Sequence, residues 1–159
     1  MSRTGLVIVA STRAAAGEYE DRSGPIAVGF LREQGLDTPD AIIVADAEIQ
    51  QAVDKALTGT DVPDVLLTSG GTGITPDDLT VEAIRPHIKK ELPGIAVAFW
   101  NKGLESVGTA ALSRCIAGVT DRTFVMTLPG STGGVKDGCA VLEGILDHLI
   151  STMKGRNDH

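Results

Sequence analysis

The sequence VLLTSGGTGITPDDLT, residues 65–80, carries the strongest indication of the fold. It begins with a short apolar run that is typical of a buried strand and continues into three closely spaced glycines, Gly70, Gly71 and Gly73. It then reaches Thr80, which can cap a helix. A buried strand followed by a glycine-rich loop and a helix indicates an alternating α/β protein.

The same alternation is present upstream of this segment. Apolar, β-branched runs at residues 5–11 and 41–45 predict two more strands. Between them, Ser23 and Pro25 favour a helix start and Gly35 a helix end, and residues 48–57 predict a second helix. Alternating strands and helices imply right-handed crossovers, so we expect a doubly wound α/β fold, a mostly parallel sheet with helices on both faces.

Downstream, the pattern predicts helices from Thr80 to just before Pro93 and over residues 94–102. Apolar runs at residues 115–119 and 123–128 predict two paired or neighbouring strands. One last helix is expected because six apolar residues share one helical face: Val135, Cys139, Leu142, Ile145, Leu146 and Leu149.

Composition limits the classes of function. The 159 residues suit a single domain, residues 1–159, and the net charge of -7 argues against binding to nucleic acid or to an anionic membrane. Residues 6–10 form an apolar run too short for a signal peptide or a membrane span, so we expect a cytoplasmic protein. The two cysteines, Cys115 and Cys139, have no metal-binding spacing.

Ligands of open α/β sheets bind beyond the carboxyl ends of the strands, where the glycine loop lies. Its exposed amides can hold phosphate, although the sequence is not a Walker motif, and the alternative is a simple tight turn. Asp77 and Asp78 follow this loop, and Asp46 ends the second predicted strand. Carboxylates beside a phosphate site would repel the phosphate unless Mg²⁺ lies between them, so the two loops predict a metal–nucleotide site. The alternative for Asp46 and Asp78 is a structural role in helix capping or loop closure.

Two later segments add candidates. LPGSTGGV, residues 128–135, is a second glycine loop whose amides lie at the start of a predicted helix and suit a phosphate or carboxylate. Ser113 and Arg114 supply a hydroxyl and a guanidinium that can grip phosphate. The structural alternatives are a helix entry for the loop and a surface ion pair for Arg114.

The order TSGGTG with an Asp shortly after, then GTAALSR, then LPGS, resembles the MogA/MoaB family of molybdenum cofactor biosynthesis proteins. The early stretch ASTRAAAGEYEDRSGP is also similar to that family, so the resemblance covers about residues 5–149. It implies a three-layer sandwich, a homotrimer and a pocket for molybdopterin. In the MogA branch it implies transfer of AMP from Mg-ATP to the terminal phosphate of molybdopterin, with release of pyrophosphate.

The resemblance also assigns roles to residues. Asp46 and Asp78 match the catalytic and Mg²⁺-binding positions. The nucleotide phosphates are expected on Ser69, Gly70, Gly71, Thr72 and Gly73. The expected contacts to molybdopterin are Ser113, Arg114, Pro129, Gly130 and Ser131. A MoeA-like protein that inserts molybdate is the expected recipient of the product.

Two positions depart from the family pattern. Asp77 stands where many relatives have Arg, and Thr127 stands where Asn is common, which predicts altered phosphate affinity and altered contacts to a ring edge. These departures leave open a MoaB-type protein that binds pterins without efficient adenylyltransfer. A flavodoxin-like domain is a third alternative, disfavoured by the scarcity of aromatic residues.

Overall fold

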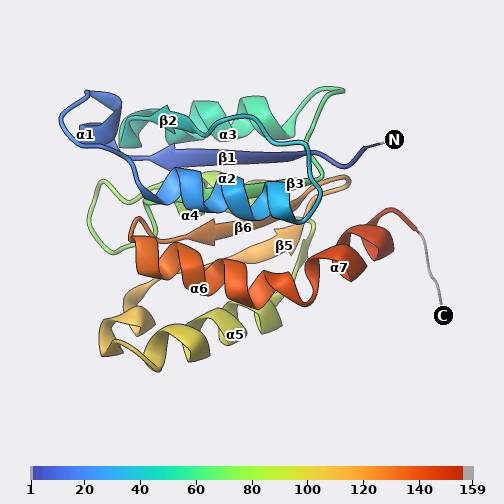
Figure 1. Cartoon of the computed structure of the whole chain (residues 1–159). Coiled ribbons are helices and arrows are strands. Elements are labelled where there is room, and N and C mark those ends of the chain that lie inside the picture. Colours follow the sequence, from blue (N-terminus) through green and yellow to red (C-terminus); the bar gives the residue numbers. More distant parts are fainter. Residues whose placement is uncertain (1, 156–159) are drawn as a thin grey trace.

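The computed structural model describes residues 2–155, which form a six-stranded sheet in the order β2-β1-β3-β6-β5-β4 (Figure 1). The strands β2, β1, β3 and β6 run parallel, whereas β5 and β4 are antiparallel to their neighbours. The bounds are β1 Gly5–Ala10, β2 Ile42–Val44, β3 Val65–Ser69, β4 Lys90–Glu91, β5 Ala117–Val119 and β6 Phe124–Leu128. The mostly parallel sheet is the one that the sequence predicts.

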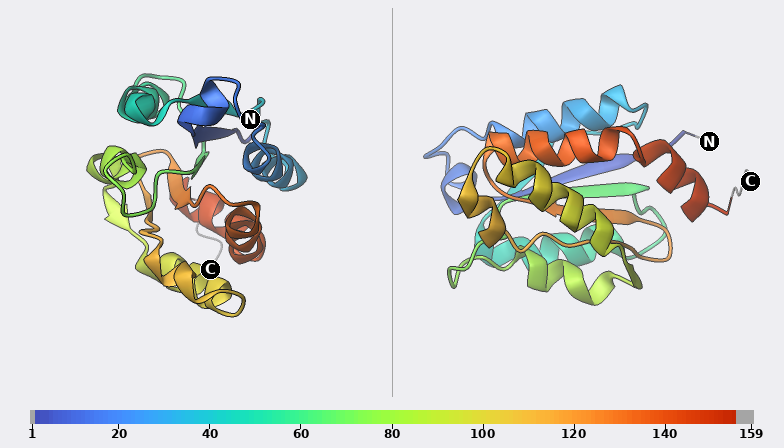
Figure 2. Two further views of the ribbon diagram at one scale, coloured as in Figure 1. Left: turned by 90° about the vertical axis from the view of Figure 1, so that its left-hand side faces the viewer. Right: turned by 90° about the horizontal axis from the view of Figure 1, so that it is seen from below.

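Helices cover both faces of the sheet (Figure 2). One face packs against α2 Ser23–Glu33, α5 Pro93–Leu104, α6 Thr132–Glu143 and α7 Leu146–Met153. The other face packs against α3 Ile49–Leu57 and α4 Thr80–Ile84, while the short helix α1 Thr12–Ala15 follows β1. Within residues 2–155, every helix is too short or too polar to traverse a lipid bilayer.

Both faces of the central strands are buried, which explains their continuous apolar sequences. In β3, Val65 and Leu67 point into the larger core cluster and Leu66 points into the smaller one. All five residues of this strand are buried. A strand with only one buried face would alternate apolar and polar residues, so the unbroken run at 65–69 already indicated a central position.

The predicted helix from Thr80 to Pro93 is wrong in its second half. Helix α4 ends at Ile84, a 3-10 turn follows over Arg85–His87, and β4 then pairs with β5 at the edge of the sheet. Pro86 in that turn lacks the N–H that would continue the helix. The edge strand is only two residues long, which left no readable pattern in the sequence.

The predicted last helix is in fact two helices. Helix α6 ends at Glu143 with Gly144 as its C-cap, and α7 begins at Leu146. Ile145, which the apolar spacing assigned to the core, lies between them and is 39% exposed. The break tilts α7 so that Leu146 and Ile150 become the buried residues of the second helix.

The sequence favours Ser23 as the N-cap of α2, but that position is held by Arg22, which makes no side-chain cap bond. Ser23 lies in the first turn, and the Asp21 carboxylate accepts hydrogen bonds from the amides of Ser23 at 3.2 Å and Gly24 at 3.1 Å. Thr80 does not cap α4 either, because its buried hydroxyl has no hydrogen-bond partner among the described residues.

Two buried threonines lie side by side at the carboxyl ends of β3 and β6. Thr68 and Thr127 are register partners on the face of the smaller core cluster, and both are fully buried. The Thr127 hydroxyl accepts a hydrogen bond from the Ile116 amide at 3.0 Å. The Thr68 hydroxyl has no partner within residues 2–155.

The same substitution at these two positions should therefore have different effects. We expect Thr127→Val to lower the free energy of unfolding by about 1–3 kcal/mol, because the buried Ile116 amide loses its acceptor. Thr68→Val should change it by less than about 1 kcal/mol, since no hydrogen bond is lost. Urea denaturation of both variants measures the difference, and equal losses would contradict this account of Thr127.

Candidate functional site

The two glycine loops meet at the carboxyl edge of the parallel strands, on the left in Figure 1. The Gly70 amide donates to the Leu128 carbonyl at 3.0 Å. A Cβ built on Gly130 would lie only 3.6 Å from the Gly70 Cα. The loop after β3 and the loop after β6 are thus packed backbone against backbone.

The loop after β3 needs its glycines. Gly70 has a φ of 92° and Gly71 a φ of 74°, in the region that residues with a Cβ rarely adopt. A side chain at Gly70 would also collide with the Ala10 carbonyl, and one at Gly71 with the Thr80 hydroxyl. The amides of Gly71 and Thr72 donate to no acceptor within residues 2–155. Gly71 is partly exposed and Thr72 is buried, so of the two Gly71 is the more accessible to a ligand.

Ser69 ties this loop to two others. Its side chain is fully buried, and its hydroxyl oxygen lies 2.9 Å from that of Ser23. It also donates to the Pro129 carbonyl at 3.0 Å. Ser69 is therefore a support of the loop.

Asp78 closes the same loop through Thr75. Its Oδ2 accepts hydrogen bonds from the Thr75 amide at 3.0 Å and from the Thr75 hydroxyl at 2.7 Å. Partial burial alone would raise the pKa of Asp78. The hydrogen bonds from Thr75 and Gly73 and the charge of Arg114 outweigh that effect and hold the pKa below its ordinary value. The carboxylate is ionised at neutral pH, as a cation ligand must be.

Asp46 follows β2 and is fixed by Thr12. The Thr12 hydroxyl donates to Asp46 Oδ2 at 3.0 Å, and the Asp46 amide donates to the Thr12 hydroxyl oxygen at 3.0 Å. Because β1 lies between β2 and β3, Asp46 and Asp78 approach the edge of the sheet from opposite sides of β1.

No group of three or more His, Cys, Asp or Glu side chains that could hold a metal is found within residues 2–155. Magnesium in nucleotide sites commonly takes one or two carboxylates and completes its shell with phosphate and water. An ionised Asp78 next to free loop amides is compatible with that mode of binding.

Arg114 braces the glycine loop from the side of β5. Its Nε donates to the Gly73 carbonyl at 2.8 Å and its Nη2 to the Asp78 carbonyl at 3.1 Å. Its Nη1 pairs with Glu82 at 2.5 Å. These contacts use three of the five N–H groups of the guanidinium, so two remain for a ligand.

A cavity of about 340 Å³ adjoins the loops, between α5, the 3-10 helix Gly108–Leu112 and the start of α6. Of the predicted substrate residues, Ser113, Pro129 and Ser131 line it, whereas Gly130 and Arg114 do not. The other lining residues are Phe99, Gly103, Ser106, Val107, Thr109, Ala110, Gly133, Gly134 and Asp137. Its volume falls within the range of small-molecule sites.

Ser131 shapes one end of this cavity. Its hydroxyl accepts a hydrogen bond from the Gly134 amide at 3.1 Å and so caps α6. Sequence reasoning missed the wall formed by Phe99, Val107 and Asp137. Phe99 and Val107 lie in or next to α5, away from the glycine loops, and the packing of α5 against α6 brings them to the site. Asp137 follows the second glycine loop by two residues, but its place in the cavity depends on the same packing.

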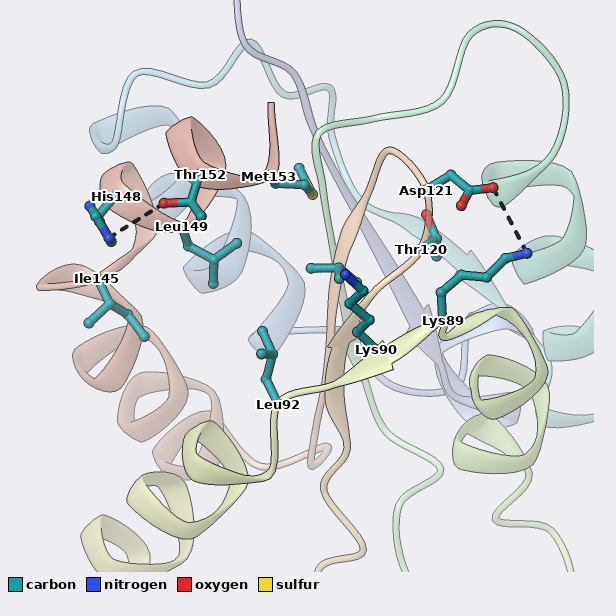
Figure 3. A pocket seen from close by; sticks show the side chains of 11 residues that line it. Lys89, Lys90, Leu92, Thr120, Asp121, Ile145, His148, Leu149, Thr152 and Met153 are labelled. Carbon is teal, nitrogen blue, oxygen red and sulfur yellow. Dashed lines mark hydrogen bonds and ion pairs between the residues drawn. The ribbon is translucent and has the colours of Figure 1, made fainter. Parts of the chain in front are cut away.

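A larger cavity, of about 590 Å³, lies between α7 and the turn before β6 and contains none of the predicted site residues (Figure 3). Its polar residues include Lys89, which lies 4.0 Å from Asp121, and His148, which lies 3.4 Å from the Thr152 hydroxyl. It is at the opposite end of the parallel strands from the glycine loops, so size alone does not identify the functional site.

The structure bears on both departures from the family pattern. The Thr127 side chain is fully buried and bonded to the Ile116 amide, and its effect on contacts to a ligand ring stays a prediction. Asp77, by contrast, has an exposed side chain next to Asp78.

The depressed pKa of Asp78 can be measured. We expect its carboxyl to titrate below 3.8 by NMR, and Thr75→Val to raise that midpoint because one hydrogen bond to the ionised form is lost. Because the pKa of Asp78 is lower in the folded than in the unfolded state, ionisation of this carboxyl stabilises the fold at pH values above the unfolded-state pKa. The contribution is lost as the pH falls through the folded-state pKa. A midpoint that Thr75→Val leaves unchanged would contradict the assigned cause.

Comparison with known proteins identifies the family of the chain. Residues 6–148 match the family described as "Probable molybdopterin binding domain". A molybdopterin adenylyltransferase of Pyrococcus furiosus is 37% identical over 150 residues, which cover 91% of this chain and 87% of the relative. A molybdenum cofactor biosynthesis protein B of Bacillus cereus is 40% identical over 138 residues, which cover 84% of this chain and 79% of the relative.

The solved structure of the molybdopterin biosynthesis Mog protein from Mycobacterium ulcerans has a TM-score of 0.89 at 37% identity, and covers 98% of this chain and 99% of that one. The chain also matches bifunctional molybdenum cofactor biosynthesis proteins and spans 48% of their length. Sequence and fold agree over nearly all the described residues, and the chain belongs to the MogA/MoaB family of molybdenum cofactor biosynthesis proteins.

Proposed function

We propose that this chain, as a single domain, transfers AMP from Mg-ATP to the terminal phosphate of molybdopterin. The observation that carries the proposal is the backbone contact between the two glycine loops, through Gly70, Leu128 and Gly130. It sets a loop with free amides directly beside the cavity at the start of α6. Two phosphorylated ligands bound at these places would meet end to end.

The nucleotide is proposed to bind to the loop after β3. The amides of Gly71 and Thr72 donate to phosphate oxygens, and Ser69 and Arg114 hold the loop in shape. Asp78 and Asp46 orient the cation that accompanies ATP. When bound, Mg²⁺ neutralises charge on the triphosphate.

Molybdopterin is proposed to bind in the cavity, with its phosphate at the start of α6. The first-turn amides of a helix have no partners within the helix and favour an anion, and Ser131 satisfies only that of Gly134. A phosphate oxygen of molybdopterin then attacks the α-phosphorus of ATP. The new bond joins this oxygen to phosphorus, and the bond to the bridging oxygen breaks as pyrophosphate leaves. The protein contributes alignment and charge stabilisation.

The proposal extends to the assembly and the setting. We include a homotrimer, a cytoplasmic location and delivery of the product to a MoeA-like protein that inserts molybdate. Exposed apolar side chains on α5 and around the 3-10 helix Gly108–Leu112 are surfaces that contacts between copies would cover. They are Val97, Leu104, Val107 and Leu112.

A MoaB-type protein that binds the pterin without efficient adenylyltransfer is the second candidate. The exposed Asp77 favours it, because it adds a negative charge next to the carboxylate proposed to hold the cation. The relatives also carry both kinds of name, an adenylyltransferase and a protein B.

Removal of either carboxylate should abolish transfer without unfolding the protein. We expect Asp78→Asn and Asp46→Asn to lower the rate of adenylylation about a hundredfold or more. Each substitution removes a carboxylate that orients Mg²⁺, and Mg²⁺ is what offsets the charge of the triphosphate in the proposed reaction. Pyrophosphate release and the mass of the adenylylated pterin measure the reaction. The matched control is Asp61→Asn, at an exposed aspartate outside the site.

Full activity in a folded Asp78→Asn variant would overturn the assignment of that residue. Tight binding of molybdopterin by the unchanged protein, without product in the presence of ATP and Mg²⁺, would favour the second candidate.

The charge at position 77 should tune affinity for the nucleotide. We expect Asp77→Arg to lower the KM for ATP roughly threefold, since an exposed charge contributes up to about 1 kcal/mol. The gain should shrink as salt screens the charge. Steady-state kinetics at low and high ionic strength test this, and a KM that does not respond to the substitution at low salt would show that Asp77 lies too far from the phosphates to matter.

A further inference from the structure

Asp137 is the one charged side chain among the residues that line the cavity at the start of α6. It lies in the second turn of that helix and faces α5, where a Cβ built on Gly103 would be 3.9 Å from its Oδ2. The residue is half-buried, and its carboxylate has no hydrogen-bond or ion-pair partner within residues 2–155.

A half-buried carboxylate without a hydrogen-bond partner loses part of its hydration, which costs free energy. A ligand with N–H donors would offset that cost by donating hydrogen bonds to the carboxylate. Asp137 is too far along α6 to cap the helix, a task that Ser131 performs. The remaining lining residues are hydroxyl-bearing, small or apolar, among them Ser106, Thr109 and Phe99. The cavity therefore combines apolar walls, hydroxyl groups and a single carboxylate, that of Asp137.

We propose that Asp137 binds the pyrimidine edge of the pterin and selects for a 2-amino-4-oxo ring. That edge carries two parallel donors, the exocyclic amino group and the ring N3–H. A carboxylate presents two acceptors in the matching arrangement, so both hydrogen bonds form at once. The inference rests on the pterin-binding half of the proposed function and does not depend on adenylyltransfer.

The same contact orients the substrate. Asp137 lies five residues after Thr132, and the rise of an α-helix places it roughly 7–8 Å along the axis from the first turn. A molecule held by its pyrimidine edge at Asp137 directs its other end toward the amides at the start of α6. That end is where Gly130 packs against Gly70. Asp137 thereby points the phosphate of the pterin at the nucleotide loop.

Two pterin analogues separate this role from a structural one. In 6-methyllumazine the amino group of 6-methylpterin is replaced by a carbonyl oxygen, so one donor becomes an acceptor. Asp137→Asn makes the matching change in the protein, because an amide offers one acceptor and one donor. The ligands are titrated by their fluorescence in the absence of ATP, into the unchanged protein, Asp137→Asn and Glu143→Gln. Glu143 is an exposed acid on α6 that does not line this cavity.

We expect the unchanged protein and Glu143→Gln to bind 6-methylpterin about tenfold or more tightly than 6-methyllumazine. In Asp137→Asn this preference should disappear or reverse, and affinity for molybdopterin itself should fall about tenfold or more. Affinity for ATP should stay the same, because the nucleotide loop is not altered.

Equal affinity of the unchanged protein for the two analogues would overturn the proposal. So would an Asp137→Asn variant that loses affinity for both to the same degree, because a general disturbance of the cavity does not change the preference. Failure of adenylyltransfer with normal pterin selectivity would refute the proposed reaction and leave the role of Asp137 standing.

Discussion

The site depends on one close approach, that of the backbone at Gly70 to the backbone at Leu128 and Gly130. It requires glycine at position 70, because the φ there is positive and a Cβ would collide with the carbonyl of Ala10. The parallel pairing of β3 with β6 brings the two loops to the same edge. Glycine at position 70 lets the chain turn there without a clash with β1, so the same residue serves the fold and the site.

Polar side chains keep this contact in one geometry. Ser69 is buried between Ser23 and Pro129, and Arg114 clamps the carbonyls of Gly73 and Asp78. Because a buried hydroxyl or a guanidinium without partners is costly, these groups oppose opening of the loops. The amides of Gly71 and Thr72 have no partner within the described residues, so one short segment contains both a rigid support and unsatisfied hydrogen-bond donors.

Charge is distributed unevenly over the site. The carboxylates of Asp46, Asp77 and Asp78 follow β2 and β3, where a cation can lie between them and a triphosphate. The start of α6 has the opposite polarity, because its first-turn amides carry partial positive charge. Asp137, in the second turn of α6, adds negative charge to the lining of the cavity. A ligand with a phosphate at one end and N–H donors at the other matches this sequence of charges.

The sequence by itself determined the parallel half of the sheet and the loops of the site, because buried strands and glycine turns are local patterns that survive in any context. Only the tertiary structure decided the role of Thr127, whose hydroxyl serves the Ile116 amide, and the place of Asp137, which joins the cavity when α6 packs on α5. It also decided the break at Gly144 and the cap from Asp21. The first two depend on groups from different elements that packing brings together, whereas the last two are local features that leave no periodic signal along the chain.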